Sequence, residues 1–155
     1  MGMDVYGRAP SSETGTYFRN NVWWWHPLWD YCELIGDGII SPDNLGHTND
    51  GWGLESLQTQ ALVQRLEQAL TSGHTERYAS AYRSRLAALP LEPCHICAAT
   101  GARAEPPAIG PGPYPCNACD GHGQVPSFET HYPFEVENVR EFVAFLKDSG
   151  GFEIY

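Results

Sequence analysis

Hydrophobic positions along the chain recur with a helical period over three stretches. The clearest stretch is 54–70, where apolar side chains recur every three or four residues. They are Leu54, Leu57, Ala61, Leu62, Leu66, Ala69 and Leu70. Asn49 or Asp50 is expected to cap the start of this helix, and Gly73 to mark its end.

A second helix is expected between Thr75 and Pro90. Its apolar stripe consists of Tyr78, Tyr82, Leu86 and Leu89. Because the connection to the first helix is short, the two helices are expected to be antiparallel neighbours. The third helical stripe consists of Val136, Val139, Phe142, Val143 and Leu146, and two glycines follow it.

The two ends of the chain have the character of strands. Met3–Gly7 and Phe152–Tyr155 are short, rich in aromatic or β-branched residues, and could pair. The sequence therefore predicts an α+β fold that is mostly helical, with small terminal strands, in a single domain of residues 1–155. A chain of this length can bury a substantial core.

The segment Tyr17–Tyr31 is dense in aromatic residues. Proline suits the first turn of a helix, so Pro27 predicts a helix from there to Ile35, with Asn20–Trp25 extended before it. In an extended segment Trp24 points away from the two neighbouring indoles. Trp24 is therefore a candidate interaction residue, and the alternative is that these rings only cover the 54–70 helix.

Residues 90–126 differ from the rest of the chain. They hold eight of the twelve prolines and lack apolar periodicity, so something other than a hydrophobic core must order them. Four cysteines occur there with the spacing C-x2-C-x18-C-x2-C: Cys94, Cys97, Cys116 and Cys119. Two residues between cysteines let one tight turn aim both sulfurs at one ion, and two such turns complete a tetrahedron.

The prediction is one structural Zn²⁺ in a loop-rich zinc-knuckle insertion, residues 90–126. Redox use of the CxxC pairs is the weaker alternative, because thioredoxin-like motifs follow a strand and begin a helix. His95 and His122 flank the cysteines and could replace one of them. A reducing, cytoplasmic location fits an odd cysteine count, in which Cys32 stands apart as a small apolar residue.

The two cysteine segments resemble the CxxCxGxG repeats of the DnaJ-type zinc domain. Cys116–Gly123 matches the repeat in full, whereas Cys94–Gly101 has Ala99 where glycine is usual. In that family two repeats pair around each ion, which implies one ion here. The absence of a J domain and of an HPD tripeptide means that a co-chaperone role does not carry over.

A single pair of repeats is also similar to the arrangement in the anti-TRAP protein, where the knuckles build a protein-binding surface. The rest of the chain, which opens MGMDVYG and closes GGFEIY, resembles a set of bacterial and phage proteins from which no activity is carried over.

Charge narrows the choice of partners. The formal net charge is −10, and four thiolates with one Zn²⁺ would make it about −12. Such a field repels phosphate backbones, and residues 90–126 hold only Arg103, so direct nucleic-acid binding is disfavoured. No apolar run of 18 residues and no secretion signal occur, so neither a membrane span nor export is expected.

A second place for chemistry is the segment Trp23–Gly53. His26 and Asp30 are four residues apart, and with His47 and Asp50 they could form an acid–base or metal site. Caps and solvated loop acids are the alternative for these residues, and none of the common catalytic motifs occurs.

The favoured hypothesis is a non-enzymatic, zinc-stabilised protein-interaction module that binds another protein. Two alternatives stay open. One is an enzyme with its site in Trp23–Gly53. The other is an acidic mimic or inhibitor of a nucleic-acid-binding partner.

Overall fold

The computed structural model describes residues 2–155 and confirms an α+β fold. The chain divides into two compact units. The main unit contains the residues up to Arg83 together with Tyr132–Tyr155, and the cysteine unit is Ser84–His131.

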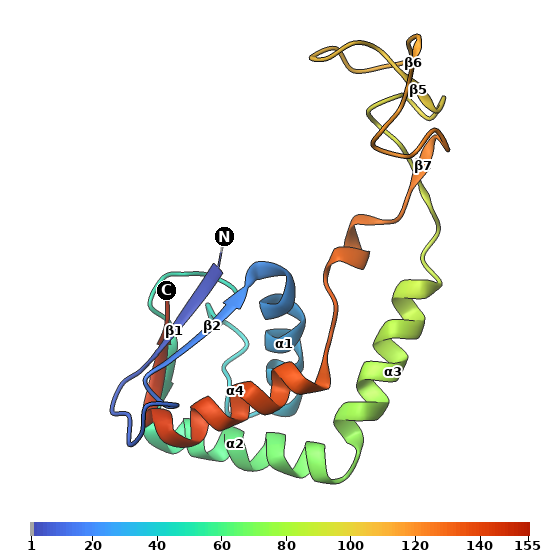
Figure 1. Cartoon of the computed structure of the whole chain (residues 1–155). Helices are drawn as coiled ribbons and strands as arrows, with labels where there is room; N and C mark the ends of the chain where they lie inside the picture. The colour runs from blue at the N-terminus through green and yellow to red at the C-terminus, as the bar shows by residue number, and fades with distance from the viewer. Residues whose placement is uncertain (1) are drawn as a thin grey trace. The chain divides into compact units, whose positions relative to one another are not determined.

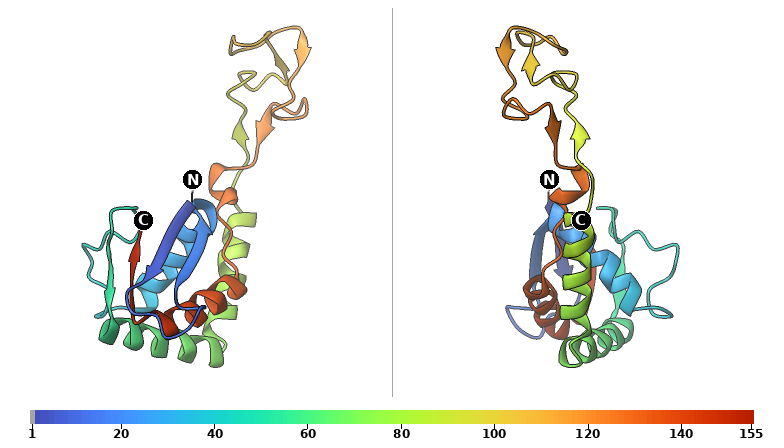
Figure 2. Two further views of the ribbon diagram at one scale, coloured as in Figure 1. Left: turned by 60° about the vertical axis from the view of Figure 1, so that its left-hand side comes forward. Right: turned by 90° about the vertical axis from the view of Figure 1, so that its right-hand side faces the viewer.

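The main unit is built on a four-stranded antiparallel sheet with the order β2-β1-β8-β3. Its strands are β1 (Gly2–Gly7), β2 (Tyr17–Asn21), β3 (Gly53–Glu55) and β8 (Gly151–Ile154). As predicted, the strands from the two ends of the chain pair, with Val5 opposite Ile154 (Figures 1 and 2).

The side chains of this sheet alternate between two faces. Met3, Val5, Phe152 and Ile154 are buried, whereas Tyr6, which follows Val5 in β1, is 46% exposed. The buried face packs against α1 (Val22–Ile35), α2 (Ser56–Thr71) and α4 (Val136–Ser149), which complete the core. The predicted stripes of α2 and α4 account for much of that core, including Leu62, Leu66, Val139, Phe142 and Leu146.

Helix α1 begins five residues earlier than the sequence predicts. The Asn21 side chain caps it by accepting a hydrogen bond from the Trp24 backbone N–H at 3.1 Å. Pro27 therefore lies in the second turn and removes one backbone hydrogen bond, which costs about 3 kcal/mol. Burial of Trp25, Leu28 and Trp29 offsets this cost, because each large side chain contributes about 1.5–3 kcal/mol.

The prediction that Asn20–Trp25 is extended holds for Asn20 and Asn21, which end β2, but is wrong from Val22 onward, where the tryptophans are arranged by helical geometry. Trp25 and Trp29, one turn apart, are fully buried and stack with ring centroids 5.5 Å apart. Trp24 is half-buried and Trp23 is 37% exposed. Trp29 is thus part of the hydrophobic core.

Helix α2 also differs from its prediction at the start. Residues 53–55 pair with β8, so the helix begins at Ser56 with Glu55 as its N-cap, and not after Asn49 or Asp50. Gln58 accepts a hydrogen bond from the Glu55 backbone N–H at 3.4 Å, as in a capping box. Leu54 consequently lies in the sheet, and Leu57 points outward with 81% exposure.

Helix α3 (His74–Ala87) does not fold back along α2 as expected. It turns away from α2 at Gly73, which has a φ of +71° (Figure 1). Its first turns pack instead on α1 and on Phe134: the Tyr31 hydroxyl contacts Thr75 Oγ1 at 2.9 Å, and Tyr78 lies 4.8 Å from Phe134 between ring centroids.

The cysteine unit contains little regular structure. Two short antiparallel pairs occur, β4 (Glu92–Pro93) with β7 (Gln124–Val125) and β5 (Ala102–Arg103) with β6 (Tyr114–Pro115) (Figure 2). A short 3-10 helix, η1 (Phe128–His131), closes the unit. The buried hydrophobic residues in this part of the described chain are the four cysteines, with Ile96 and Val125 packed beside them.

Candidate metal centre

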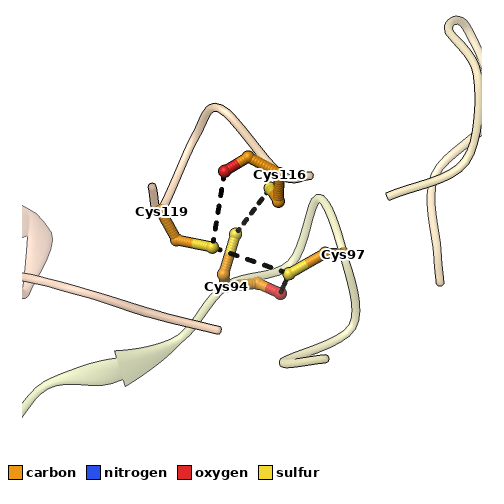
Figure 3. Close-up of side chains that lie close together, drawn as sticks. All are labelled: Cys94, Cys97, Cys116 and Cys119. Carbon is orange, nitrogen blue, oxygen red and sulfur yellow. Dashed lines mark hydrogen bonds between the residues drawn. The ribbon is translucent and has the colours of Figure 1, made fainter. Parts of the chain in front are cut away.

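The four predicted cysteines converge on one point in the cysteine unit. Their sulfurs point toward one another and all lie within 4.8 Å of each other (Figure 3). The four side chains are Cys94, Cys97, Cys116 and Cys119, each at most 5% exposed and none in a disulfide.

Two knuckles with the same backbone geometry bring these cysteines together. In the first, the backbone N–H of Ala99 donates to the Cys94 carbonyl at 2.9 Å, and in the second Gly121 donates to Cys116 at 2.9 Å. The knuckles also bond to each other reciprocally. The N–H of Cys94 donates to the Gly123 carbonyl and that of Cys116 to the Gly101 carbonyl, both at 2.9 Å.

This pairing gives the unit an approximate two-fold symmetry around the sulfur cluster, because these backbone hydrogen bonds occur in both knuckles. Residues four positions after the second cysteine of each knuckle carry the backbone amides that approach sulfur. Gly101 N lies 3.3 Å from Cys97 Sγ, and Gly123 N lies 3.1 Å from Cys119 Sγ. Such amides stabilise thiolate charge.

The sulfur separations fit a single tetrahedral ion. Cys94 Sγ lies 3.9 Å from Cys116 Sγ, and Cys97 Sγ lies 3.8 Å from Cys119 Sγ. Four sulfurs at about 2.3 Å from a central zinc ion would be about 3.8 Å apart, whereas a disulfide requires about 2.05 Å. Each of these distances joins a cysteine of the first knuckle to a cysteine of the second. An ion bound here would therefore link two turns that have no apolar core between them.

The electrostatics of the thiols depend on their amide contacts. Desolvation opposes ionisation of Cys97, but the Gly101 amide and the neighbouring thiols lower its pKa to about 7. Desolvation raises the pKa of Cys119 to about 11. A bound dication would favour the thiolate form of all four cysteines.

The departure from the repeat at Ala99 has a structural consequence. Ala99 has a φ of +63°, and the equivalent Gly121 has a φ of +78°. Positive φ costs a residue with a Cβ about 1–2 kcal/mol. The first knuckle keeps the geometry of the second despite this cost.

A second group of potential ligands forms in the main unit, from part of the segment singled out in the sequence. His47 Nε2 lies 3.2 Å from Asp30 Oδ1, and His47 Nδ1 lies 2.8 Å from His26 Nδ1. The structure thus brings three of the four predicted residues together. Asp50 is exposed and is not a member of this group.

Glu33, which was not among the predicted site residues, belongs to this group, and Asn44 holds it in place. Glu33 Oε2 lies 3.6 Å from His47 Nε2, and Asn44 Nδ2 donates to Glu33 Oε1 at 2.7 Å. Glu33 follows Asp30 by three residues in a helix, a spacing that places both carboxylates on one face. That signal was available in the sequence once the helix was placed, whereas the role of Asn44 depends on how the loop folds.

The two histidines have opposite electrostatic environments. The hydrogen bond with Asp30 raises the pKa of His47 above its usual range. Burial, followed by the charge of His47, lowers the pKa of His26. The pKa values of the two rings are thus shifted in opposite directions.

The remaining candidates lie apart from both groups. His95 and His122 are exposed and belong to neither group of potential ligands. Cys32 is fully buried in the main core, and burial raises its pKa far above the usual thiol range. Trp24 borders a surface hollow together with Arg19, Asn21, Glu137 and Asn138.

Comparison with protein-family models, with curated proteins and with solved structures found no match for this chain. Among residues 2–155, no helix combines the length and the apolarity that crossing a membrane would need.

Proposed function

We propose that this protein is a zinc-stabilised, non-enzymatic protein-interaction module that holds one Zn²⁺ through Cys94, Cys97, Cys116 and Cys119. The observation that carries this proposal is the cluster of four buried sulfurs with tetrahedral separations. Four-sulfur tetrahedral sites are typical of zinc or of iron–sulfur clusters, and the narrow space between these sulfurs suits a single ion. Four thiolates leave no open coordination position, so the ion would be structural.

The resemblance to paired CxxCxGxG repeats supports the same interpretation. Equivalent hydrogen bonds in the two knuckles are what a pair of repeats around one ion requires. We also propose that residues 90–126 form a zinc-knuckle insertion within a single domain. The compact unit Ser84–His131 includes that whole segment.

The surface of the cysteine unit supports an interaction role. Ile109 is 69% exposed, Leu91 56% and Tyr114 48%, although the unit has few apolar residues to spare for its own interior. Exposed aromatic and aliphatic side chains on a rigid scaffold are typical anchors for a partner protein. A hollow beside Tyr114 is lined by Arg103, Glu105, Pro106, Pro115 and Asn117.

The chemistry of the partner follows from charge. Residues 84–131 contain four Asp or Glu residues against two Arg and no Lys. A bound ZnS₄ centre would add a net charge of about −2. The partner is therefore another protein that presents apolar side chains surrounded by basic residues. Trp24 on the main unit is a second candidate contact.

Metal analysis tests the first half of the proposal. Protein purified without added metal is expected to contain about one zinc per chain, with Zn–S distances near 2.3 Å by X-ray absorption. Iron in its place, or metal-free protein with a Cys94–Cys97 disulfide, would contradict the assignment.

An affinity pull-down from the native host tests the second half. Cys116→Ser removes one sulfur and should lose both zinc and partner. Ile109→Ser should keep zinc and still lose the partner, which separates the surface from the metal. Leu57→Ser is the matched control, because Leu57 is 81% exposed but lies in the main unit. Equal capture by all four proteins would reject the interaction surface.

A specific group of side chains supports the alternative that the protein is an enzyme. The group of His26, Asp30, Glu33 and His47 is a plausible acid–base or metal site for an enzyme. Loss of a catalytic activity in Asp30→Asn, in a protein that captures no partner, would favour this alternative.

A further inference from the structure

We propose that Asp30, Glu33 and His47 form a second metal site, which binds a divalent cation such as Mn²⁺ through oxygen and nitrogen ligands. This inference does not rest on the interaction role or on the cysteine site. It concerns residues of the main unit alone and a different ligand chemistry. Imidazole and carboxylate suit Mn²⁺ and other first-row divalent ions, whereas a site of four thiolates does not suit Mn²⁺.

The three ligand atoms have the separations that one ion needs. His47 Nε2 lies 3.2 Å from Asp30 Oδ1 and 3.6 Å from Glu33 Oε2, and all three atoms lie within 4.8 Å of one another. Ligands at about 2.0–2.2 Å from an ion are about 3.0 Å apart at a right angle and about 3.4 Å apart at the tetrahedral angle. Small side-chain rotations would complete such a site.

A local framework positions two of these ligands. His47 presents Nε2 to the carboxylates and uses Nδ1 to contact His26 Nδ1 at 2.8 Å. A metal-binding histidine commonly donates its second ring N–H to a fixed partner in this way. The unprotonated Nδ1 of a neutral His26 ring is an acceptor for that hydrogen bond.

Glu33 is held by a chain of hydrogen bonds that starts in the core. Trp29 Nε1 donates to Asn44 Oδ1 at 2.9 Å, and Asn44 Nδ2 donates to Glu33 Oε1 at 2.7 Å. The backbone N–H of Gly46 also donates to Asn44 Oδ1 at 2.9 Å. Glu33 Oε1 is thereby fixed, and Oε2 remains directed toward His47.

An ion pair with His47 accounts for only part of this arrangement. One Nε2–H group can donate a straight hydrogen bond to one carboxylate, and Glu33 Oε2 at 3.6 Å is beyond hydrogen-bonding distance. The second carboxylate adds repulsion in a chain of net charge −10. A dication would neutralise both carboxylates and accept the lone pair of His47 Nε2.

The site would leave coordination positions open to solvent. The side chains of Asp30, Glu33 and His47 are 56%, 34% and 35% exposed. Three protein ligands with open positions are the arrangement that lets a metal bind water or a substrate, in contrast to the closed cysteine site.

Titration of Mn²⁺ into the full-length, zinc-loaded protein tests this inference. The free ion is followed by electron paramagnetic resonance, and the histidine ring signals by NMR. We expect saturable binding of about one Mn²⁺ per chain, with selective broadening of the His47 and His26 ring signals. Asp30→Asn, Glu33→Gln and His47→Gln should each weaken binding at least tenfold, because each removes a direct ligand.

Asp50→Asn is the matched control. It removes the same charge from the same segment, but Asp50 lies outside the ligand group, so its affinity should equal that of the wild type. Asp30 is more than half exposed, so Asp30→Asn is expected to fold normally. The site is rejected if wild-type binding does not saturate, or if Asp50→Asn weakens it as much as Asp30→Asn does.

Discussion

The main unit and the cysteine unit are stabilised by different interactions. The main unit buries a continuous core of aromatic and aliphatic side chains between one sheet and three helices. In the cysteine unit the buried hydrophobic residues are the four cysteines, and the turns around them bond to one another through their backbones. Apolar burial therefore stabilises the first unit, whereas the proposed Zn²⁺ would have to stabilise the second by joining its two knuckles.

The two units should also respond differently to metal removal. If the proposed ion is bound, its loss would remove the main stabilising link of the cysteine unit and leave the main unit with its own core. Chelation and core mutations should consequently act on different parts of the chain.

Metal removal should have its largest effect on the reactivity of the cysteine thiols. Metal-loaded protein is expected to react slowly with a thiol reagent, and a chelator should make four cysteines react quickly. Cys32 should stay unreactive until a denaturant is added, because it is fully buried and burial raises its pKa. Simultaneous reaction of all five thiols after chelation would show that the two units do not behave independently.

The next largest effect is expected from a core substitution, which should lower the stability of the main unit. Trp29→Ala is expected to lower the free energy of unfolding by about 3–5 kcal/mol, because Trp29 is fully buried among aromatic rings. Denaturant titration measures the loss, and zinc content should not change. Trp23→Ala is the matched control: Trp23 is 37% exposed, so we expect a loss of about 1 kcal/mol. Equal losses would contradict the assignment of Trp29 to the core.

Two substitutions in the cysteine unit are expected to change its metal affinity by smaller amounts and in opposite directions. Ala99→Gly should tighten metal binding and Gly121→Ala should weaken it, each by about 1 kcal/mol or fivefold, because both positions have positive φ. A Cβ on Gly121 would meet no atom closer than 4.0 Å, so backbone strain alone is tested. Competition with a chromophoric chelator measures both variants. Changes of the same sign would refute the equivalence of the two knuckles.

The last and weakest effect concerns binding of this protein to nucleic acid. Affinity for duplex DNA at physiological salt should be weaker than about 10⁻⁴ M, because the chain carries a net charge of −10. Tight binding that weakens steeply with salt would refute the charge argument and would direct attention to Arg65, Arg77, Arg83 and Arg85.

Local signals made the cysteine cluster predictable. Two residues between cysteines fix the turn that aims both sulfurs at one point, whatever the rest of the chain does. The stripes of α2 and α4 and the pairing of β1 with β8 were also predictable, since apolar periodicity specifies a buried face.

Elements that depend on distant contacts were not predictable. The start of α2 is set by pairing of Leu54 with Phe152, almost a hundred residues away. The start of α1 depends on a competition between the Asn21 cap and Pro27, which packing of the indoles decides. Glu33 joins His47 only because Asn44 folds the loop over α1.

Backbone amide hydrogen exchange with and without a chelator tests the central claim most directly. On metal removal, amides in Ser84–His131 should exchange quickly, including those of Cys94 and Cys116 that join the two knuckles. Amides in α2, α4 and the β1–β8 pair should keep their protection, since these elements have their own core. Unchanged protection in the cysteine unit, or loss of protection throughout the chain, would contradict the dependence of that unit alone on metal.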